Sequence, residues 1–66
     1  MDKRYKGHTI IVHAEQDDFT DLWNGRYRIL DDVDRVVYES FTEAASKKGD
    51  AISSAEAAAR KWVNQR

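Results

Sequence analysis

Hydrophobic and polar side chains alternate along parts of this chain, and the alternation predicts β-strands. It is clearest between about residues 22 and 30, because successive side chains of a strand point to opposite faces of a sheet. One face, which we expect to pack in the core, comprises Trp23, Gly25, Tyr27 and Ile29. The other, polar face comprises Asn24, Arg26 and Arg28. This segment is therefore predicted to be a half-buried strand.

Two more segments have a strand-type sequence. Residues 8–14 are rich in β-branched side chains, which favour strands. Within them Ile10–Val12 is a continuous apolar run, so both faces of this strand have apolar character. The third segment covers residues 35–41, where Val36 and Tyr38 alternate with Arg35, Val37 and Glu39.

The connections between these segments are polar. Residues 31–34 form a short, aspartate-rich stretch that favours a tight turn, so the strands on either side of it are predicted to be antiparallel. Residues 15–21 are acidic around Phe19 and are predicted to be a hairpin loop. Residues 42–50 fit either one or two helical turns ended by Gly49 or an ordered loop.

The alanine-rich segment at about residues 54–65 predicts an amphipathic helix. Its expected buried stripe follows helical spacing and comprises Ala55, Ala58, Ala59 and Trp62. Ser53 is placed to cap the N-terminus of the helix, and Glu56, three residues later, completes a capping box. Glu56 and Arg60 are spaced to form an ion pair on the exposed side.

Together these elements predict one α+β domain over residues 1–66, with a three-stranded antiparallel sheet packed on a C-terminal helix. The helical stripe is expected to meet a set of sheet residues, namely Tyr27, Ile29, Val36 and Tyr38. That packing leaves Arg26, Arg28 and Arg35 on the opposite face of the sheet as the candidate binding residues.

Composition narrows the functional classes. The chain has 66 residues and no cysteine, so disulfides and cysteine-ligated zinc sites are excluded. The net charge of −1 argues against a generic nucleic-acid binder, which is usually strongly basic. The longest strongly apolar run is Ile10–Val12, so we expect no membrane-spanning segment, and a cytoplasmic location.

No arrangement of residues indicates catalysis or a cofactor. His8 and His13 are an odd number of residues apart on one predicted strand, so they point to opposite faces and do not share a metal. The acidic loops lack the alternating ligands, glycine and distal glutamate of a calcium loop. The glycines are isolated, so no phosphate-binding loop is predicted. We therefore expect a protein that is not an enzyme, with no cofactor and no metal.

The order of these elements resembles a known kind of DNA-binding domain. Gly25–Ile29, Arg35–Phe41 and the following alanine-rich helix are similar to the AP2/ERF type, and in plan to the arm-binding domains of tyrosine recombinases. The resemblance implies that Arg26 and Arg35 contact DNA from a sheet in the major groove. The chain departs from the AP2 pattern at Val37, where that family has a contacting tryptophan.

Two functional hypotheses follow for a small binding protein of bacterial or phage type. The first is protein–protein interaction or self-association through an exposed strand edge or through apolar positions such as Ile11, Phe19 and Val37. The alternative is nucleic-acid binding through the arginine face, because arginine recognises phosphate and base edges well. The slightly acidic balance of charge favours the first.

Overall fold

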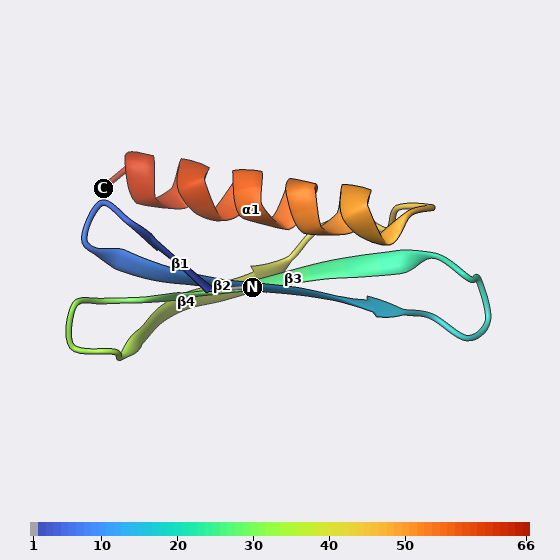
Figure 1. The fold of residues 1–66 in the computed structure, drawn as a ribbon, viewed down its shortest axis with the longest axis horizontal. Helices are drawn as coiled ribbons and strands as arrows, with labels where there is room; N and C mark the ends of the chain where they lie inside the picture. The colour runs from blue at the N-terminus through green and yellow to red at the C-terminus, as the bar shows by residue number, and fades with distance from the viewer. Residues whose placement is uncertain (1) are drawn as a thin grey trace.

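The computed structural model describes residues 2–66 as an antiparallel sheet with one helix lying along it (Figure 1). The elements, in chain order, are β1 (Asp2–Tyr5), β2 (His8–Gln16), β3 (Trp23–Leu30), β4 (Val36–Phe41) and α1 (Lys48–Asn64). Each strand pairs with the next in the sequence, so the sheet order is β1-β2-β3-β4. The α+β class, the antiparallel sheet and the C-terminal helix are as predicted.

The prediction of three strands is wrong, because β1 adds a fourth at one edge. Its residues are mostly charged, so no hydrophobic alternation marks it. A two-residue turn joins β1 to β2, and Lys6 and Gly7 both have positive φ (48° and 80°), as tight hairpin turns require. Contacts with α1 hold β1 in place: the Tyr5 hydroxyl donates a hydrogen bond to Asn64 Oδ1 over 3.0 Å, and Lys3 pairs with Glu56 over 3.3 Å.

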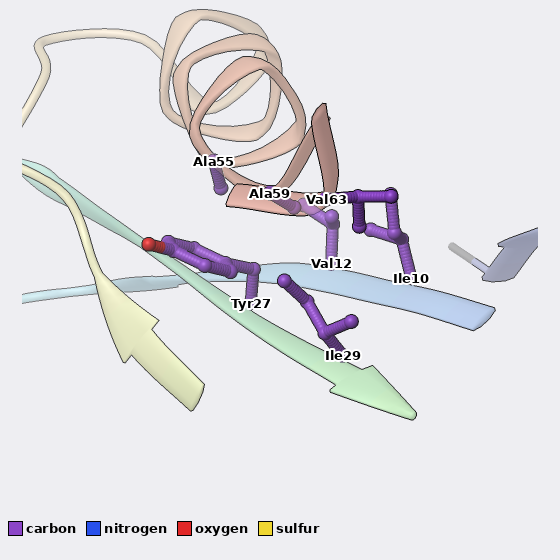
Figure 2. Close-up of a cluster of buried hydrophobic side chains, with 7 residues drawn as sticks. All are labelled: Ile10, Val12, Tyr27, Ile29, Ala55, Ala59 and Val63. Atoms are coloured by element: carbon purple, nitrogen blue, oxygen red, sulfur yellow. The ribbon is translucent and has the colours of Figure 1, made fainter. Parts of the chain in front are cut away.

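The core lies between α1 and the two central strands (Figure 2). It consists of Ile10 and Val12 from β2, Tyr27 and Ile29 from β3, and Ala55, Ala59 and Val63 from α1. The short alanine side chains let the helix approach the sheet closely. Burial raises the pKa of the Tyr27 phenol above its ordinary value of 10.0, so its hydroxyl stays neutral.

The helix begins earlier than its capping signals indicate. It starts at Lys48, so Ser53 and Glu56 are interior helical residues and the predicted cap at Ser53 is wrong. Before the helix, Ala45 exchanges two backbone hydrogen bonds with Trp23, of 2.7 and 2.8 Å. The ambiguous residues 42–50 are thus an extended connection followed by the first helical turn.

The buried stripe of α1 also differs from the prediction. It comprises Ala51, Ala55, Ala59 and Val63. Ala58 and Trp62 flank this stripe and are only partly buried. The buried face of the helix is therefore shifted relative to the predicted one. The predicted ion pair between Glu56 and Arg60 is confirmed.

The predicted burial of β4 is wrong. Val36 and Tyr38 were expected in the core, but they are 51% and 39% exposed. The reason is that α1 packs mainly on β2 and β3 and reaches β4 only at one end, where Trp62 stacks on Tyr38. Two apolar residues of β2, Ile10 and Val12, take the core positions instead.

Candidate binding surface on the open sheet face and the β4 edge

The sheet has one face against α1 and one face turned away from it, which we call the open face. Arg26 and Arg28 of β3 lie there, because they alternate with the buried Tyr27 and Ile29. Cross-strand pairing places further residues beside them: Ile11, His13 and Glu15 from β2, and Glu39 and Phe41 from β4. The sequence correctly places these two arginines on the polar face.

Both arginines of the open face are paired with carboxylates. Arg28 Nε donates to Glu39 Oε2 over 3.1 Å, directly across the β3–β4 ladder. Arg26 Nη1 lies 3.6 Å from Glu15 Oε1, and the same carboxylate oxygen lies 3.7 Å from His13 Nε2. All of these side chains are about half exposed or more, so each pair is worth no more than about 1 kcal/mol. The pairs nevertheless place negative charge beside each guanidinium.

Arg35, the third predicted binding residue, is not on the open face of the sheet strands. It precedes β4 in the β3–β4 turn, where its Nε lies 3.4 Å from Asp31 Oδ2 and its side chain is 80% exposed. Asp31 Oδ1 accepts hydrogen bonds from the N–H groups of Val33 and Arg35, over 3.0 and 2.9 Å. These bonds, led by the one from Arg35, hold the pKa of Asp31 below its ordinary value.

The three predicted arginines therefore do not form a continuous positive surface. Two share the open face with Glu15 and Glu39, and the third is bound to a turn carboxylate. A protein that binds the DNA backbone through electrostatics needs cationic groups that are free to replace counterions. The sequence shows the arginines but not their partners, since cross-strand pairing depends on register.

Apolar side chains gather on β4 instead. The exposed fractions are 74% for Phe41, 51% for Val36, 42% for Val37 and 39% for Tyr38. Four of the six residues of this strand are thus apolar or aromatic and largely solvent-exposed. Among the sites proposed from sequence, Val37 lies in this group, and Ile11 is half-buried on the open face. An edge strand of this composition is unusual unless it is covered by something.

Phe19 is exposed elsewhere, at the tip of the β2–β3 hairpin. Its side chain is 99% exposed. Its loop is well ordered by hydrogen bonds: Asp17 Oδ1 accepts from the N–H groups of Phe19 and Thr20, over 2.7 and 3.2 Å. The β2–β3 loop lies at the opposite end of the sheet from the β3–β4 turn (Figure 1), so the exposed Phe19 belongs to a different part of the surface from the β4 side chains.

The outer edge of β4 carries free backbone groups. Among residues 2–66, β4 pairs only with β3, so its other side has no strand partner. Thr42 N–H donates to Gly25 O over 2.9 Å. Hydrogen-bonded and non-hydrogen-bonded pairs alternate along an antiparallel ladder, so Ser40 also faces β3, whereas the amides of Glu39 and Phe41 point outward.

On the side of β4 that faces α1, two aromatic rings stack. Tyr38 stacks on Trp62 of α1, with ring centroids 5.2 Å apart and planes 18° apart. The guanidinium of Arg66 lies 4.0 Å from the Trp62 ring centre on that same helix end. Through the Tyr38–Trp62 contact, α1 packs against one side chain of β4.

The histidines are separated as predicted. His8 lies on the α1 side, edge-on to Trp62 with ring centroids 6.1 Å apart, and His13 lies on the open face. Within residues 2–66, no group of three or more histidine, aspartate or glutamate residues is arranged to hold a metal ion. In the same range, no helix is both long and apolar enough to cross a membrane.

No known family, curated protein or solved structure matches this chain. The resemblance of Gly25–Ile29 and Arg35–Phe41 to AP2/ERF domains stays a prediction. The open face and β4 are therefore the features of the molecule that indicate a function.

Proposed function

We propose that this domain is a non-enzymatic binding module that mediates protein–protein interaction or self-association through β4. The observation that carries the proposal is the coincidence of two features on one strand. β4 has exposed apolar side chains, led by Phe41, and outward-pointing amides at Glu39 and Phe41. A strand from a partner supplies hydrogen bonds to such an edge and apolar contacts to its side chains at once.

The charge distribution supports a protein partner over a nucleic acid. Arg26 and Arg28 have carboxylates within 3.6 Å, and the chain as a whole carries a net charge of −1. Bringing a phosphate to either guanidinium would also bring it close to Glu15 or Glu39. Nucleic-acid binding through Arg26, Arg28 and Arg35 is therefore the weaker alternative.

Selection of extended peptides on the immobilised protein tests the proposal. Peptides that bind wild type are expected to lose binding to Phe41→Lys and to keep it with Phe19→Lys. The two variants add the same charge at a highly exposed phenylalanine, but only Phe41 lies on β4. Selected peptides should also shift the NMR signals of β4 amides.

Two results would contradict the proposal. One is that no selected peptide distinguishes Phe41→Lys from Phe19→Lys. The other is that duplex DNA at low salt shifts the side-chain signals of Arg26 and Arg28, in which case the alternative function gains support.

A further inference from the structure

We infer that the partner of β4 is a second copy of this chain, paired antiparallel about a two-fold axis at Ser40. This inference rests on the proposed function, because it names the occupant of the same edge. The result is one sheet that runs through both copies, with both helices on one face and both open faces on the other.

The two edges of the sheet differ in a way that selects β4 for pairing. β1 has four residues, and three of them are the charged Asp2, Lys3 and Arg4. Short, charged edge strands resist pairing with other sheets. β4 has Glu39 as its single charged residue and contains no proline. Pairing of β4 with β4 is therefore favoured over any arrangement that uses β1.

The register follows from backbone geometry and charge. A shift in the β3–β4 register next to Leu30 makes the ladder irregular at Val36 and Val37, so the regular part of the edge begins at Tyr38. Within that part, a hydrogen-bonded pair between two copies needs outward-pointing amides in both strands, so Glu39 or Phe41 of one copy pairs with Glu39 or Phe41 of the other. These pairings place the two-fold axis at residue 39, 40 or 41.

Like charges exclude two of these three axes. An axis at residue 39 places the Glu39 carboxylates of the two copies directly opposite each other. An axis at residue 41 places Glu39 opposite Glu43 of the second copy. Like charges directly opposite across strands are destabilising. An axis at Ser40 pairs Glu39 with Phe41 and places no like charges directly opposite each other. The two Glu39 carboxylates then lie on a diagonal, farther apart, and each is paired with Arg28 of its own copy.

The Ser40 axis also covers the most exposed apolar residue of β4. Phe41 then lies opposite Glu39 of the second copy and diagonally across from its Val37 and Phe41, within reach of an aromatic side chain. Glu39 keeps its hydrogen bond to Arg28 on the open face. Phe41, 74% exposed in the single chain, thereby gains apolar neighbours on both sides.

A single cysteine at the axis tests the inference directly, since the chain has none of its own. The Ser40 pair is a non-hydrogen-bonded one, in which the Cα atoms are about 4.5 Å apart, within the range of a disulfide. Ser40→Cys should form a covalent dimer on mild oxidation about tenfold or more faster than Ser54→Cys, because pairing raises the local thiol concentration. Ser54 is an exposed helical serine and serves as the matched control.

Sedimentation of the cysteine-free protein provides an independent readout that needs no change at Ser40. Wild type should shift from monomer to dimer between about 10 µM and 1 mM, the range expected of a small interface. Phe41→Lys should stay monomeric over that range, and Phe19→Lys should associate like wild type.

The outcomes separate this inference from the proposed function. A wild type that stays monomeric up to about 1 mM, together with equal oxidation rates for the two cysteine variants, overturns self-pairing. If selected peptides still bind β4 in that case, the proposed function stands with a different partner. If neither peptides nor a second copy engage β4, both proposals fail.

Discussion

A single carboxylate organises the turn that leads into β4. Asp31 accepts two backbone hydrogen bonds and lies beside the Arg35 guanidinium, and its own N–H donates to Arg35 O over 2.9 Å. The bonds to Asp31 favour the ionised form in the folded state. They thereby fix where β4 begins.

The lowered pKa of Asp31 predicts a pH dependence. Because the folded state binds this proton less tightly than the unfolded state, the stabilisation is fully present above the ordinary aspartate pKa of about 3.9 and is lost as the pH falls through the lowered value. A carboxyl ¹³C NMR titration should place the midpoint of Asp31 below 3.9, and Asp31→Asn should lower stability at neutral pH. A midpoint at or above 3.9 would contradict the hydrogen bonding described for this turn.

Gly25 is a second residue at which local space decides stability. A Cβ there would collide with the backbone carbonyl oxygen of Ala51 in the helix and would lie 3.1 Å from Ala51 C. Gly25→Ala should therefore lower the free energy of unfolding by about 1–3 kcal/mol, measured by urea denaturation.

Gly49→Ala is the matched control for this test. It lies in the first turn of α1 with nothing within 4 Å of the added Cβ, so it should be neutral or stabilising by up to about 1 kcal/mol. Equal effects of the two substitutions would mean that α1 does not approach β3 as closely as described.

At the level of elements, the structure and the sequence prediction differ at the residue where α1 begins. Ser53 is an exposed residue within the helix, and Lys47 occupies the N-cap position. Ser53→Ala should therefore raise the stability by a few tenths of a kcal/mol, because alanine is the better helix former. A loss of about 1 kcal/mol, measured by thermal or urea unfolding, would instead identify Ser53 as the cap that its sequence context predicts.

Sequence reasoning succeeds where one pattern determines the element. The alternation in β3 places Tyr27 and Ile29 inside and Arg26 and Arg28 outside, as observed. It fails where two patterns compete. At the helix start, the Ser53–Glu56 capping signal predicts a later start than the buried stripe, which extends back to Ala51. β1 was missed because its charged residues form a strand only through pairing and contacts with α1.

The candidate surface was partly predictable for a related reason. The sequence predicts Val37 and a free strand edge as binding sites, but its alternation places Tyr38 in the core. Both faces of β2 are apolar, so the pattern does not say whether the helix covers β2 or β4. Once the helix lies on β2 and β3, β4 is left as an apolar edge.

At the scale of the whole molecule, the arginines of the open face pair with carboxylates on neighbouring strands, and exposed apolar side chains are concentrated on β4. The described chain is elongated, with extents of 37 × 18 × 15 Å. Its helix covers the two central strands, and β1 is protected by charge. The outer edge of β4 has no strand partner among residues 2–66 and a single charged residue, Glu39. This organisation leaves β4 as the edge at which we propose that a partner strand pairs.

Amide hydrogen exchange along β4 at two protein concentrations tests this claim most directly. In dilute solution, the amides of Ser40 and Thr42 should be protected by β3, while those of Glu39 and Phe41 exchange rapidly. At concentrations where the protein associates, Glu39 and Phe41 should become protected as well, and the exposed loop around Phe19 should not change. Exchange at Glu39 and Phe41 that stays rapid at every concentration, and with every selected peptide, would contradict the assignment of β4 as the binding edge.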